Sequence, residues 1–234
     1  RDVGQDFAAD VCLRSMSHRG FAGSARRGQS STDTRAGGLL IMWTERGIAA
    51  HLVRQTFQRK FLVVPNCYWT GHECDLLVVT PRLMVIDVEI KCTRADLRAD
   101  AAKQKWWYTP LFFSNCGEPR PAKQARDWPP RVWRHYYCAP TEIWQPEMLG
   151  DLLTTANGDR ALLAPQSGVI LVREDERGQI VSDVVRRARS NPDAKPITAE
   201  QAIDIARLAN LRMWDALTEL DRLRAAGQNT PEEA

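Results

Sequence analysis

The sequence lacks several features that would place it in a specialised class of protein. No stretch is long or apolar enough to span a membrane, and no glycine-rich phosphate loop is present. We therefore expect neither a membrane protein nor an ATP-driven motor, and no nucleotide cofactor. The 4 histidines are too few and too dispersed for a hydrolase triad. The 6 cysteines are scattered without a CxxC pair, so a reducing cytoplasm is the simplest location.

An excess of one charge is also missing. The chain of 234 residues carries 32 basic and 29 acidic side chains, and a net charge of +3 does not by itself indicate nucleic acid. Its hydrophobic fraction of 44% suits one globular core with extensions. We expect an N-terminal arm over residues 1–38, partly flexible because it is rich in Ser, Gly and Arg. A core over 39–190 and a C-terminal helix over 196–226, packed on that core, should follow.

Two segments between residues 71 and 92 are the most informative part of the chain. They read Gly71-His-Glu-Cys-Asp75-Leu-Leu-Val-Val and Met84-Val-Ile-Asp87-Val-Glu89-Ile-Lys91, and Thr80-Pro81-Arg82 predicts a turn between two strands. Alternation places Asp87, Glu89 and Lys91 on one face, with Asp75 opposite or diagonal to the acids. Half-buried carboxylates at such a short separation repel one another unless a cation lies between them. Because Lys91 alone supplies too little charge, the pattern predicts a divalent metal.

Glu89-Ile-Lys91 on one strand, with Asp75 on the strand before it, resembles the PD-(D/E)XK nuclease superfamily. Residues 89–100 resemble the MmcB-like DNA-repair branch, as do 135–140 and 168–172. The resemblance covers roughly residues 40–190, although no proline precedes Asp75. It implies an α/β fold with a restriction-endonuclease-like core, a mixed β-sheet flanked by helices. The implied activity is metal-dependent hydrolysis of phosphodiester bonds, with DNA as the expected substrate, in repair, recombination or mobile-element processes.

The resemblance also assigns roles to residues. Asp75, Glu89 and the backbone carbonyl of Ile90 would hold Mg²⁺, with Mn²⁺ as a substitute. Lys91 would hold or polarise the attacking water and stabilise developing negative charge. Asp87 could orient Lys91 or support the metal through water, and Glu73 is a further minor candidate.

Three further residues match positions that complete such sites. Glu45, near the start of an expected helix over 39–58, would orient water or hold a second metal; its alternative role is to interact with the helix dipole. Gln104 and Tyr108 match the Gln-x-x-x-Tyr spacing of the RecB-like branch, where these residues lie beside the active site and DNA. The alternative for Gln104 is a boundary position that hydrogen-bonds a loop.

The segment 109–134 is predicted to be a long, basic loop, because five prolines interrupt it. Basic side chains can neutralise phosphates, and aromatic rings can stack on unpaired bases. The alternative is a solvated loop whose tryptophans pack on the core. The candidate nucleic-acid contacts, together with Tyr108, are Arg120, Lys123, Arg126, Trp128, Arg131, Trp133 and Arg134.

Local patterns predict the remaining elements. Thr93 should cap a helix that runs to about Tyr108, and its stripe of Leu97, Ala101, Gln104 and Tyr108 should face the sheet. Thr198, with Gln201 at the third helical position, should cap a final helix whose apolar stripe includes Ile205, Leu217 and Leu220. The other expected elements are strands at 60–69, 133–139, 167–173 and 180–186 and a helix at 141–153.

Two other functions stay open. The chain could be a catalytically inactive nuclease-fold module that binds nucleic acid or a protein partner, although the intact acids and Lys91 argue against this. A zinc or iron–sulfur site could form from Cys67, His72, Cys74 and Cys92, but the spacing matches no standard zinc pattern. Cys74 and Cys92 are expected to face away from Asp75. The oligomeric state is open, and a homodimer or larger complex is compatible with the sequence.

Overall fold

The computed structural model describes residues 43–57, 61–109, 123–148 and 163–228. The expected arm over 1–38 lies outside these ranges, as do residues 110–122 of the basic loop. The elements in chain order are α1 (Glu45–His51), the π-helix η1 (Leu52–Thr56), β1 (Leu62–Cys67), β2 (Cys74–Val79), β3 (Val85–Ile90), α2 (Arg94–Ala99), the 3₁₀ turns η3 (Asp100–Ala102) and η4 (Gln104–Trp106), β4 (Trp107–Tyr108), β5 (Gln124–Ala125), β6 (Arg134–Pro140), the 3₁₀ turn η5 (Pro146–Met148), β7 (Gly168–Glu174), β8 (Ile180–Arg186) and α3 (Ala199–Gln228).

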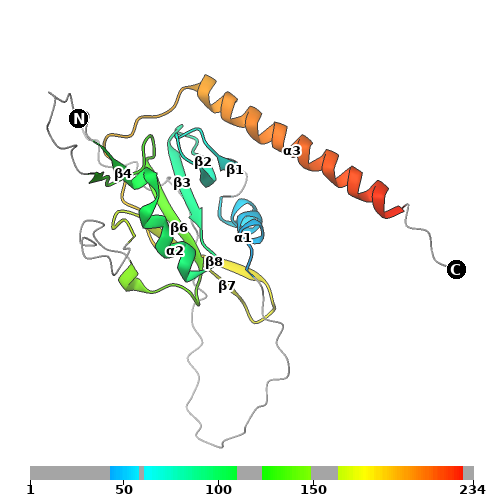
Figure 1. Ribbon diagram of the computed structural model, residues 1–234, viewed down its shortest axis with the longest axis horizontal. Coiled ribbons are helices and arrows are strands. Elements are labelled where there is room, and N and C mark those ends of the chain that lie inside the picture. The colour runs from blue at the N-terminus through cyan, green and yellow to red at the C-terminus, as the bar shows by residue number, and fades with distance from the viewer. Residues whose placement is uncertain (1–42, 58–60, 110–122, 149–162, 229–234) are drawn as a thin grey trace, which may run out of the picture.

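A six-stranded mixed sheet in the order β1-β2-β3-β6-β7-β8 forms the centre of the molecule (Figure 1). β1, β2 and β3 are antiparallel neighbours, β3, β6 and β7 run parallel, and β8 returns antiparallel to β7. α2 lies in the connection from β3 to β6, as a parallel crossover requires. The expected α/β architecture with a mixed sheet is therefore confirmed.

Both faces of the sheet are covered, so the central strand β3 is wholly buried. On one face, Ile48 and Leu52 of α1 and η1 pack in a core with the strands. On the other face, Leu97 and Trp106 pack against Tyr137 of β6. Charged residues on β3 are consequently withdrawn from water and need partners.

The helix after β3 is shorter than its sequence predicts. Thr93 caps α2 as expected, because its Oγ1 accepts a hydrogen bond from the backbone N–H of Asp96 at 3.1 Å. The helix then ends at Ala99 instead of about Tyr108, and two 3₁₀ turns follow. Lys103 between them is extended, with φ −62° and ψ 143°. Gln104 is exposed as a result, so the prediction that it faces the sheet is wrong.

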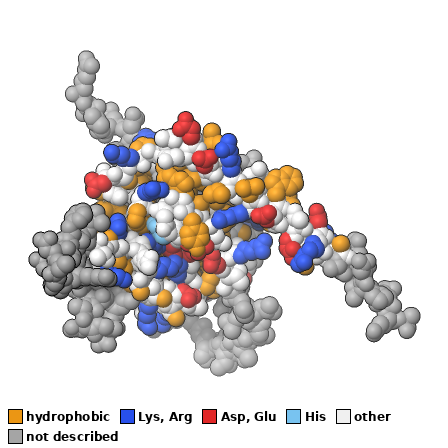
Figure 2. All heavy atoms as spheres, turned by 45° about the horizontal axis from the view of Figure 1, so that its top comes forward, with side chains coloured by type: hydrophobic (Ala, Val, Ile, Leu, Met, Phe, Trp, Pro, Cys, Tyr) orange, Lys and Arg blue, Asp and Glu red, His pale blue; other side chains and the backbone are white. Residues whose placement is uncertain are grey.

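The C-terminal helix also departs from expectation. Thr198 and Gln201 form the predicted capping box, with reciprocal hydrogen bonds of 2.9 and 3.2 Å. Ile205 is buried, but Leu217 and Leu220 are each 42% exposed. The helix projects beyond the sheet (Figure 1). Apolar side chains are visible where it leaves the body (Figure 2). The prediction that the whole stripe packs on the core is thus wrong, because only the beginning of the helix packs there.

Two smaller differences concern other helices. Residues 43–57 begin the described chain with a short α-helix that continues as a π-helix, instead of one helix over 39–58. Of the expected helix over 141–153, residues 146–148 form a 3₁₀ turn, and residues from 149 lie outside the described ranges. Among the described residues, no helix is both long and apolar enough to cross a membrane.

Candidate active site

The structure brings the carboxylates of Asp75 and Glu89 to the same ammonium group. Lys91 Nζ lies 3.0 Å from Asp75 Oδ2 and 2.5 Å from Glu89 Oε2. The three residues come from the adjacent strands β2 and β3 and from the residue that follows β3. Glu89 and Lys91, which follow Asp75 by 14 and 16 residues in the sequence, therefore meet it at one point.

The side chain of Asp75 accepts a hydrogen bond from a main-chain N–H group of β3, beyond the regular pairing of β2 and β3. The regular pairing of β2 and β3 is recorded from Leu76 opposite Val88 to Val79 opposite Val85. Beyond this ladder, the backbone N–H of Ile90 donates a hydrogen bond of 2.6 Å to Asp75 Oδ2. The same oxygen accepts from Lys91, so it is fixed by two donors.

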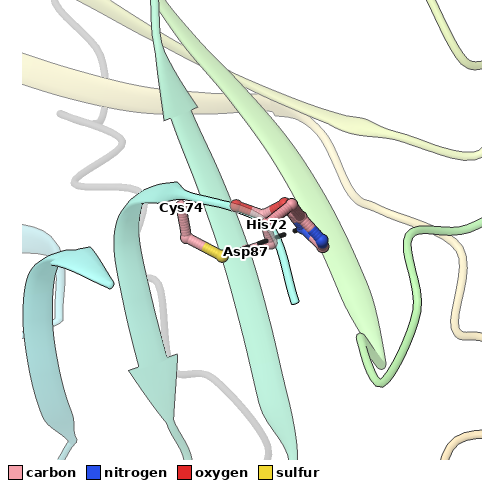
Figure 3. A group of neighbouring side chains, drawn as sticks. All are labelled: His72, Cys74 and Asp87. Carbon is pink, nitrogen blue, oxygen red and sulfur yellow. Dashed lines mark hydrogen bonds and ion pairs between the residues drawn. The ribbon is translucent and has the colours of Figure 1, made fainter. Parts of the chain in front are cut away.

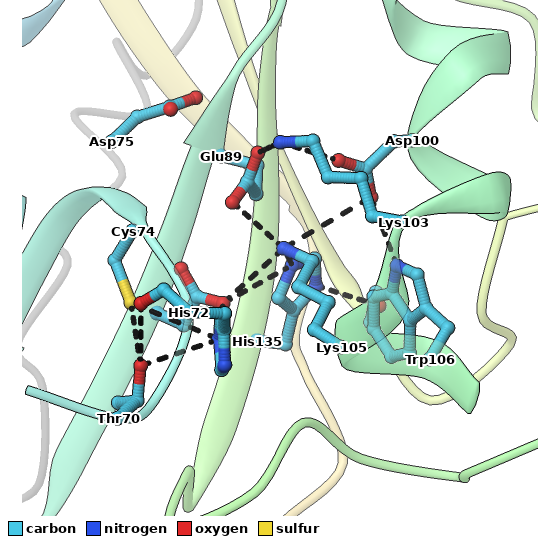
Figure 4. Close-up of polar contacts among 12 residues, drawn as sticks. Thr70, His72, Cys74, Asp75, Glu89, Asp100, Lys103, Lys105, Trp106 and His135 are labelled. Carbon is cyan, nitrogen blue, oxygen red and sulfur yellow. Dashed lines mark hydrogen bonds and ion pairs between the residues drawn. The ribbon is translucent and has the colours of Figure 1, made fainter. Parts of the chain in front are cut away.

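Three lysines contact Glu89, which is fully buried. Figure 4 shows two of them, Lys103 and Lys105. Besides Lys91, Lys103 Nζ lies 2.6 Å from Glu89 Oε2 and Lys105 Nζ lies 2.7 Å from Oε1. Burial alone would raise the pKa of Glu89, but the charges of Lys105, Lys91 and Lys103 hold it below its usual range. Glu89 is therefore an ionised carboxylate held by three ammonium groups.

Asp100 is a fourth acid in the network, contributed by the first 3₁₀ turn. Its Oδ2 accepts hydrogen bonds from Trp106 Nε1 at 3.0 Å and Tyr137 Oη at 2.9 Å. Its Oδ1 lies 3.2 Å from Lys103 Nζ. This buried carboxylate thus connects the end of α2 to β6.

Asp87 has a separate set of partners. Its Oδ2 lies 3.3 Å from Lys105 Nζ, 3.4 Å from His72 Nε2 and 3.7 Å from His135 Nε2. Burial would raise the pKa of Asp87, but Lys105 and the hydrogen bond from His72 lower it to about 2. Asp87 therefore pairs with Lys105, and the expectation that it orients Lys91 is wrong.

His135 supports Lys105 from β6. Burial first, and then the charge of Lys105, lower the pKa of His135 to about 3, so the ring is neutral. Its Nε2 lies 3.1 Å from Lys105 Nζ and its Nδ1 lies 2.9 Å from Ser167 Oγ. A neutral ring that accepts from Lys105 and donates to Ser167 satisfies both contacts.

These partners change the charge argument made from sequence. Four carboxylates (Asp75, Asp87, Glu89 and Asp100) face three ammonium groups (Lys91, Lys103 and Lys105), which leaves one net negative charge. The sequence suggested that Lys91 is the sole compensating cation, and the structure shows that it is one of three. The acids therefore do not require a metal for their stability, although the site remains net negative.

A pocket of about 530 Å³ opens beside this network. Its lining includes Glu45, Asp75, Lys91, Asp100 and Lys103, but not Glu89. Glu45 is the first residue of α1, which Thr44 caps by accepting the N–H of Gly47 at 3.1 Å. The predicted helix acid thus reaches the same pocket as Asp75 and Lys91. Burial, followed by the charge of Glu89, raises the pKa of Asp75 to about 6.

The candidate nucleic-acid contacts do not line this pocket. Arg134 stacks on Trp133 at 3.9 Å, and the N–H of Trp133 bonds the carbonyl of Val85 at the start of β3. Ile90 lines the pocket and lies five positions after Val85 on β3. The Trp133–Arg134 pair therefore lies about 17 Å along the strand from the pocket. Arg131 stacks on Trp69 at 5.4 Å, away from the pocket as well.

The other predicted contacts lie elsewhere. Tyr108 Oη donates to Gln124 in the β4–β5 pair, and Arg126 stacks on its ring at 5.1 Å. The indole N–H of Trp128 donates to the carbonyl of Arg189, and Lys123 is exposed. Arg120 lies outside the described residues. Neither Gln104 nor Tyr108 is among the residues that line the pocket. Glu73, the minor candidate, accepts from Tyr68 on the surface.

Comparisons with known proteins add little to this geometry. No family model matches the chain, and no curated protein matches it. The SPO1766 protein of unknown function from Silicibacter pomeroyi is a similar solved structure, with a TM-score of 0.39 and 18% identity over 81% of this chain and 93% of that chain. A TM-score this low supports no conclusion about fold family or function. The functional argument therefore depends on the residues of the site.

Sequence reasoning missed Asp100, Lys103, Lys105 and His135. One signal could have found His135, because the parallel register places it beside Asp87 and places Tyr137 beside Glu89. Alternation then puts both side chains on the face of the acids. The lysines gave no such signal, since a continuous helix would have separated Lys103 and Lys105 by about 200° around its axis.

Proposed function

We propose that the protein is a metal-dependent nuclease that hydrolyses phosphodiester bonds, with DNA as its substrate. The observation that carries this proposal is the convergence of Asp75 and Glu89 on Lys91, next to a pocket that also holds Glu45. Two acids from paired strands and one lysine are the groups that the PD-(D/E)XK resemblance requires. A restriction-endonuclease-like core is part of the same proposal, because α2 and the mixed sheet supply the elements around these residues.

The donor set fits Mg²⁺. Hard divalent cations prefer carboxylate and carbonyl oxygens and keep several waters, so one or two protein carboxylates beside an open pocket are sufficient. Asp75 and the carbonyl of Ile90 would hold the ion, with Glu89 as the second acid and Glu45 across the pocket. When bound, the ion would activate water and neutralise charge on the phosphate. The net negative charge of the buried network favours a cation there.

Lys91 acts as a hydrogen-bond donor in this proposal and does not act as a base. Burial lowers the pKa of Lys91, but the charges of Glu89, Asp75 and Asp100 raise it above its usual value. The side chain therefore stays an ammonium at neutral pH, suited to orient water and to stabilise negative charge that develops on a phosphoryl oxygen. Lys103 is 43% exposed at its side chain and can reach a phosphate from the pocket wall.

The test uses labelled single-stranded, double-stranded and branched DNA, with matched RNA, in the presence and absence of Mg²⁺ or Mn²⁺. Asp75→Asn should lower cleavage by about two orders of magnitude or more. Glu73→Gln is the matched control, because Glu73 belongs to the same segment but bonds Tyr68 on the surface. Cleavage that is equal in both variants and the parent would refute the site. Asp75 is preferred to Glu89 because removal of Glu89 would also unbalance the three lysines that contact it.

A second function is favoured by one observation. Glu89 is fully buried, contacts all three lysines and does not line the pocket. That arrangement suits a nuclease-fold module that binds nucleic acid without cutting it. Mg²⁺-dependent strand scission separates the two functions. Binding of the same substrates without any scission, unchanged by Asp75→Asn, would select the module.

A further inference from the structure

A second cluster of polar side chains joins the start of β2 to β3, outside the pocket of the candidate active site. It consists of His72, Cys74 and Asp87, whose possible ligand atoms all lie within 4.8 Å of one another (Figure 3). We name it the His–Cys–Asp cluster. None of its members lines that pocket.

Distances within the cluster approach those of a four-coordinate zinc site. Cys74 Sγ lies 3.9 Å from His72 Nε2, and His72 Nε2 lies 3.4 Å from Asp87 Oδ2. Tetrahedral coordination with ordinary zinc bond lengths separates sulfur from nitrogen by about 3.6 Å and nitrogen from oxygen by about 3.4 Å. The sulfur and the carboxylate oxygen lie within 4.8 Å of each other, against about 3.6 Å in a tetrahedral site. Side-chain movements of up to about 1 Å would complete the geometry.

One buried oxygen atom of the cluster is unsatisfied in its hydrogen bonding. Asp87 is fully buried, and its Oδ1 has no hydrogen-bond partner among the described residues. Buried carboxylate oxygens are normally satisfied, so an unpaired one needs an explanation. Cys74 is fully buried as well, whereas His72 keeps 14% of its side chain exposed. The imidazole thus gives a route from solvent to two buried ligands.

We propose that the His–Cys–Asp cluster binds one Zn²⁺ through His72 Nε2, Cys74 Sγ and a carboxylate oxygen of Asp87. A mixed nitrogen, sulfur and oxygen set suits zinc and disfavours Mg²⁺, which needs hard oxygen ligands. Three protein ligands leave a fourth position for water. The inference is independent of the nuclease proposal, because it uses none of the residues that would hold Mg²⁺.

The charges balance when the ion binds. A Cys74 thiol releases one proton to solvent when the Zn–S bond forms, because only the thiolate binds the ion. The thiolate and the Asp87 carboxylate then match the two charges of Zn²⁺. Lys105 keeps Glu89 as its partner at 2.7 Å.

A zinc ion there would fasten the β1–β2 connection to the central strand. The N–H of Gly71 bonds the carbonyl of Tyr68, and Gly71 adopts a positive φ of 96° to make this turn. Within the described part of the chain, the hydrogen bond between His72 and Asp87 ties this turn to β3. The ion would therefore act as a structural clip beside Glu89.

The experiment loads the full chain with Zn²⁺, removes free metal by gel filtration and measures retained zinc by mass spectrometry. A parallel sample takes Co²⁺, whose absorption shows four-coordinate geometry and a thiolate charge-transfer band. We expect one metal ion per chain, the thiolate band, and a melting temperature that falls after chelation. A chain that retains no zinc, or gives a cobalt spectrum without the thiolate band, overturns the proposal.

Variants assign the ligands. Cys74→Ser should abolish the thiolate band and His72→Ala should lower metal retention several-fold, whereas Cys138→Ser, a buried thiol outside the cluster, should change neither. Asp75→Asn should also retain zinc, which separates this site from the nuclease centre. If Cys74→Ser does not fold, His72→Ala decides the assignment, because His72 is partly exposed. A thiolate band that persists at full strength in both cluster variants contradicts the proposal.

Discussion

Lys103 Nζ lies 2.6 Å from Glu89 Oε2, and Lys103 lines the pocket whereas Glu89 does not. Lys103 is the most exposed of the three lysines around Glu89. Its ammonium group is therefore the cation that an incoming metal would displace first.

Replacement of Lys103 should strengthen metal binding. In Lys103→Met, the concentration of Mn²⁺ that half-saturates the protein should fall about fivefold, because a partly exposed ion pair contributes about 1 kcal/mol. Isothermal titration calorimetry measures this directly. Lys123→Met, which removes an exposed lysine that does not line the pocket, is the control. An unchanged or higher half-saturating concentration in Lys103→Met would show that Lys103 does not compete with the ion.

The raised pKa of Asp75 predicts a pH dependence of stability. Its value rises from 3.8 to about 6 on folding, so the folded chain holds a proton that the unfolded chain has released. The contribution of this proton to the free energy of unfolding is present below pH ~4 and is lost as pH rises through ~6.

Urea denaturation at a series of pH values tests this sign. Between pH ~4 and ~7.5 the parent should lose at most about 3 kcal/mol from this group, and Asp75→Asn should not show that loss. Glu73→Gln should follow the parent. Parallel pH curves for the parent and Asp75→Asn would mean that Asp75 titrates normally.

Removal of Lys105 should destabilise the fold strongly. Lys105 is 3% exposed and pairs with both Asp87 and Glu89. Lys105→Met therefore leaves buried Asp87 without its lysine partner and removes one of the three lysines around Glu89. We expect a loss of about 3–5 kcal/mol in the free energy of unfolding, measured in urea. Lys195→Met, an exposed lysine, should change it little. The double variant Lys105→Met with Asp87→Asn should recover part of the loss, and a cost near zero for Lys105→Met would contradict the buried pairing.

Loss of the cap of α2 should have a smaller effect. Thr93→Ala removes the acceptor for the N–H of Asp96 and should lower the free energy of unfolding by about 1 kcal/mol. Thr93→Ser keeps the acceptor and should stay near the parent. Equal loss in both variants would point to the methyl group of Thr93 and away from capping.

The sequence predicted those parts of the structure that depend on local rules. The strands over residues 62–90 and 168–186 and the caps at Thr93 and Thr198 follow from alternation and from hydroxyl groups ahead of helices. Asp75, Glu89 and Lys91 could be brought together because two paired strands fix their relation. Glu45 needed the resemblance in addition, since no local rule connects α1 to β3.

Features that depend on tertiary contacts could not be predicted in the same way. The extended conformation of Lys103 ends the helical pattern so that Lys103 and Lys105 both reach Glu89, and helix propensity carries no signal of that pairing. The stripe on α3 has the correct period, but periodicity does not state how much of a helix a core can cover. The exposure of Leu217 and Leu220 is therefore a property of the whole fold.

The hydrogen bond from the Ile90 amide to the Asp75 carboxylate makes one main-chain group a reporter on the pocket. A ligand that draws the carboxylate away would free this amide, while the neighbouring ladder between β2 and β3 stays closed. Deuterium uptake at Ile90 should therefore quicken when the pocket is occupied, and it could reveal a bound ion or substrate even where no bond is cut.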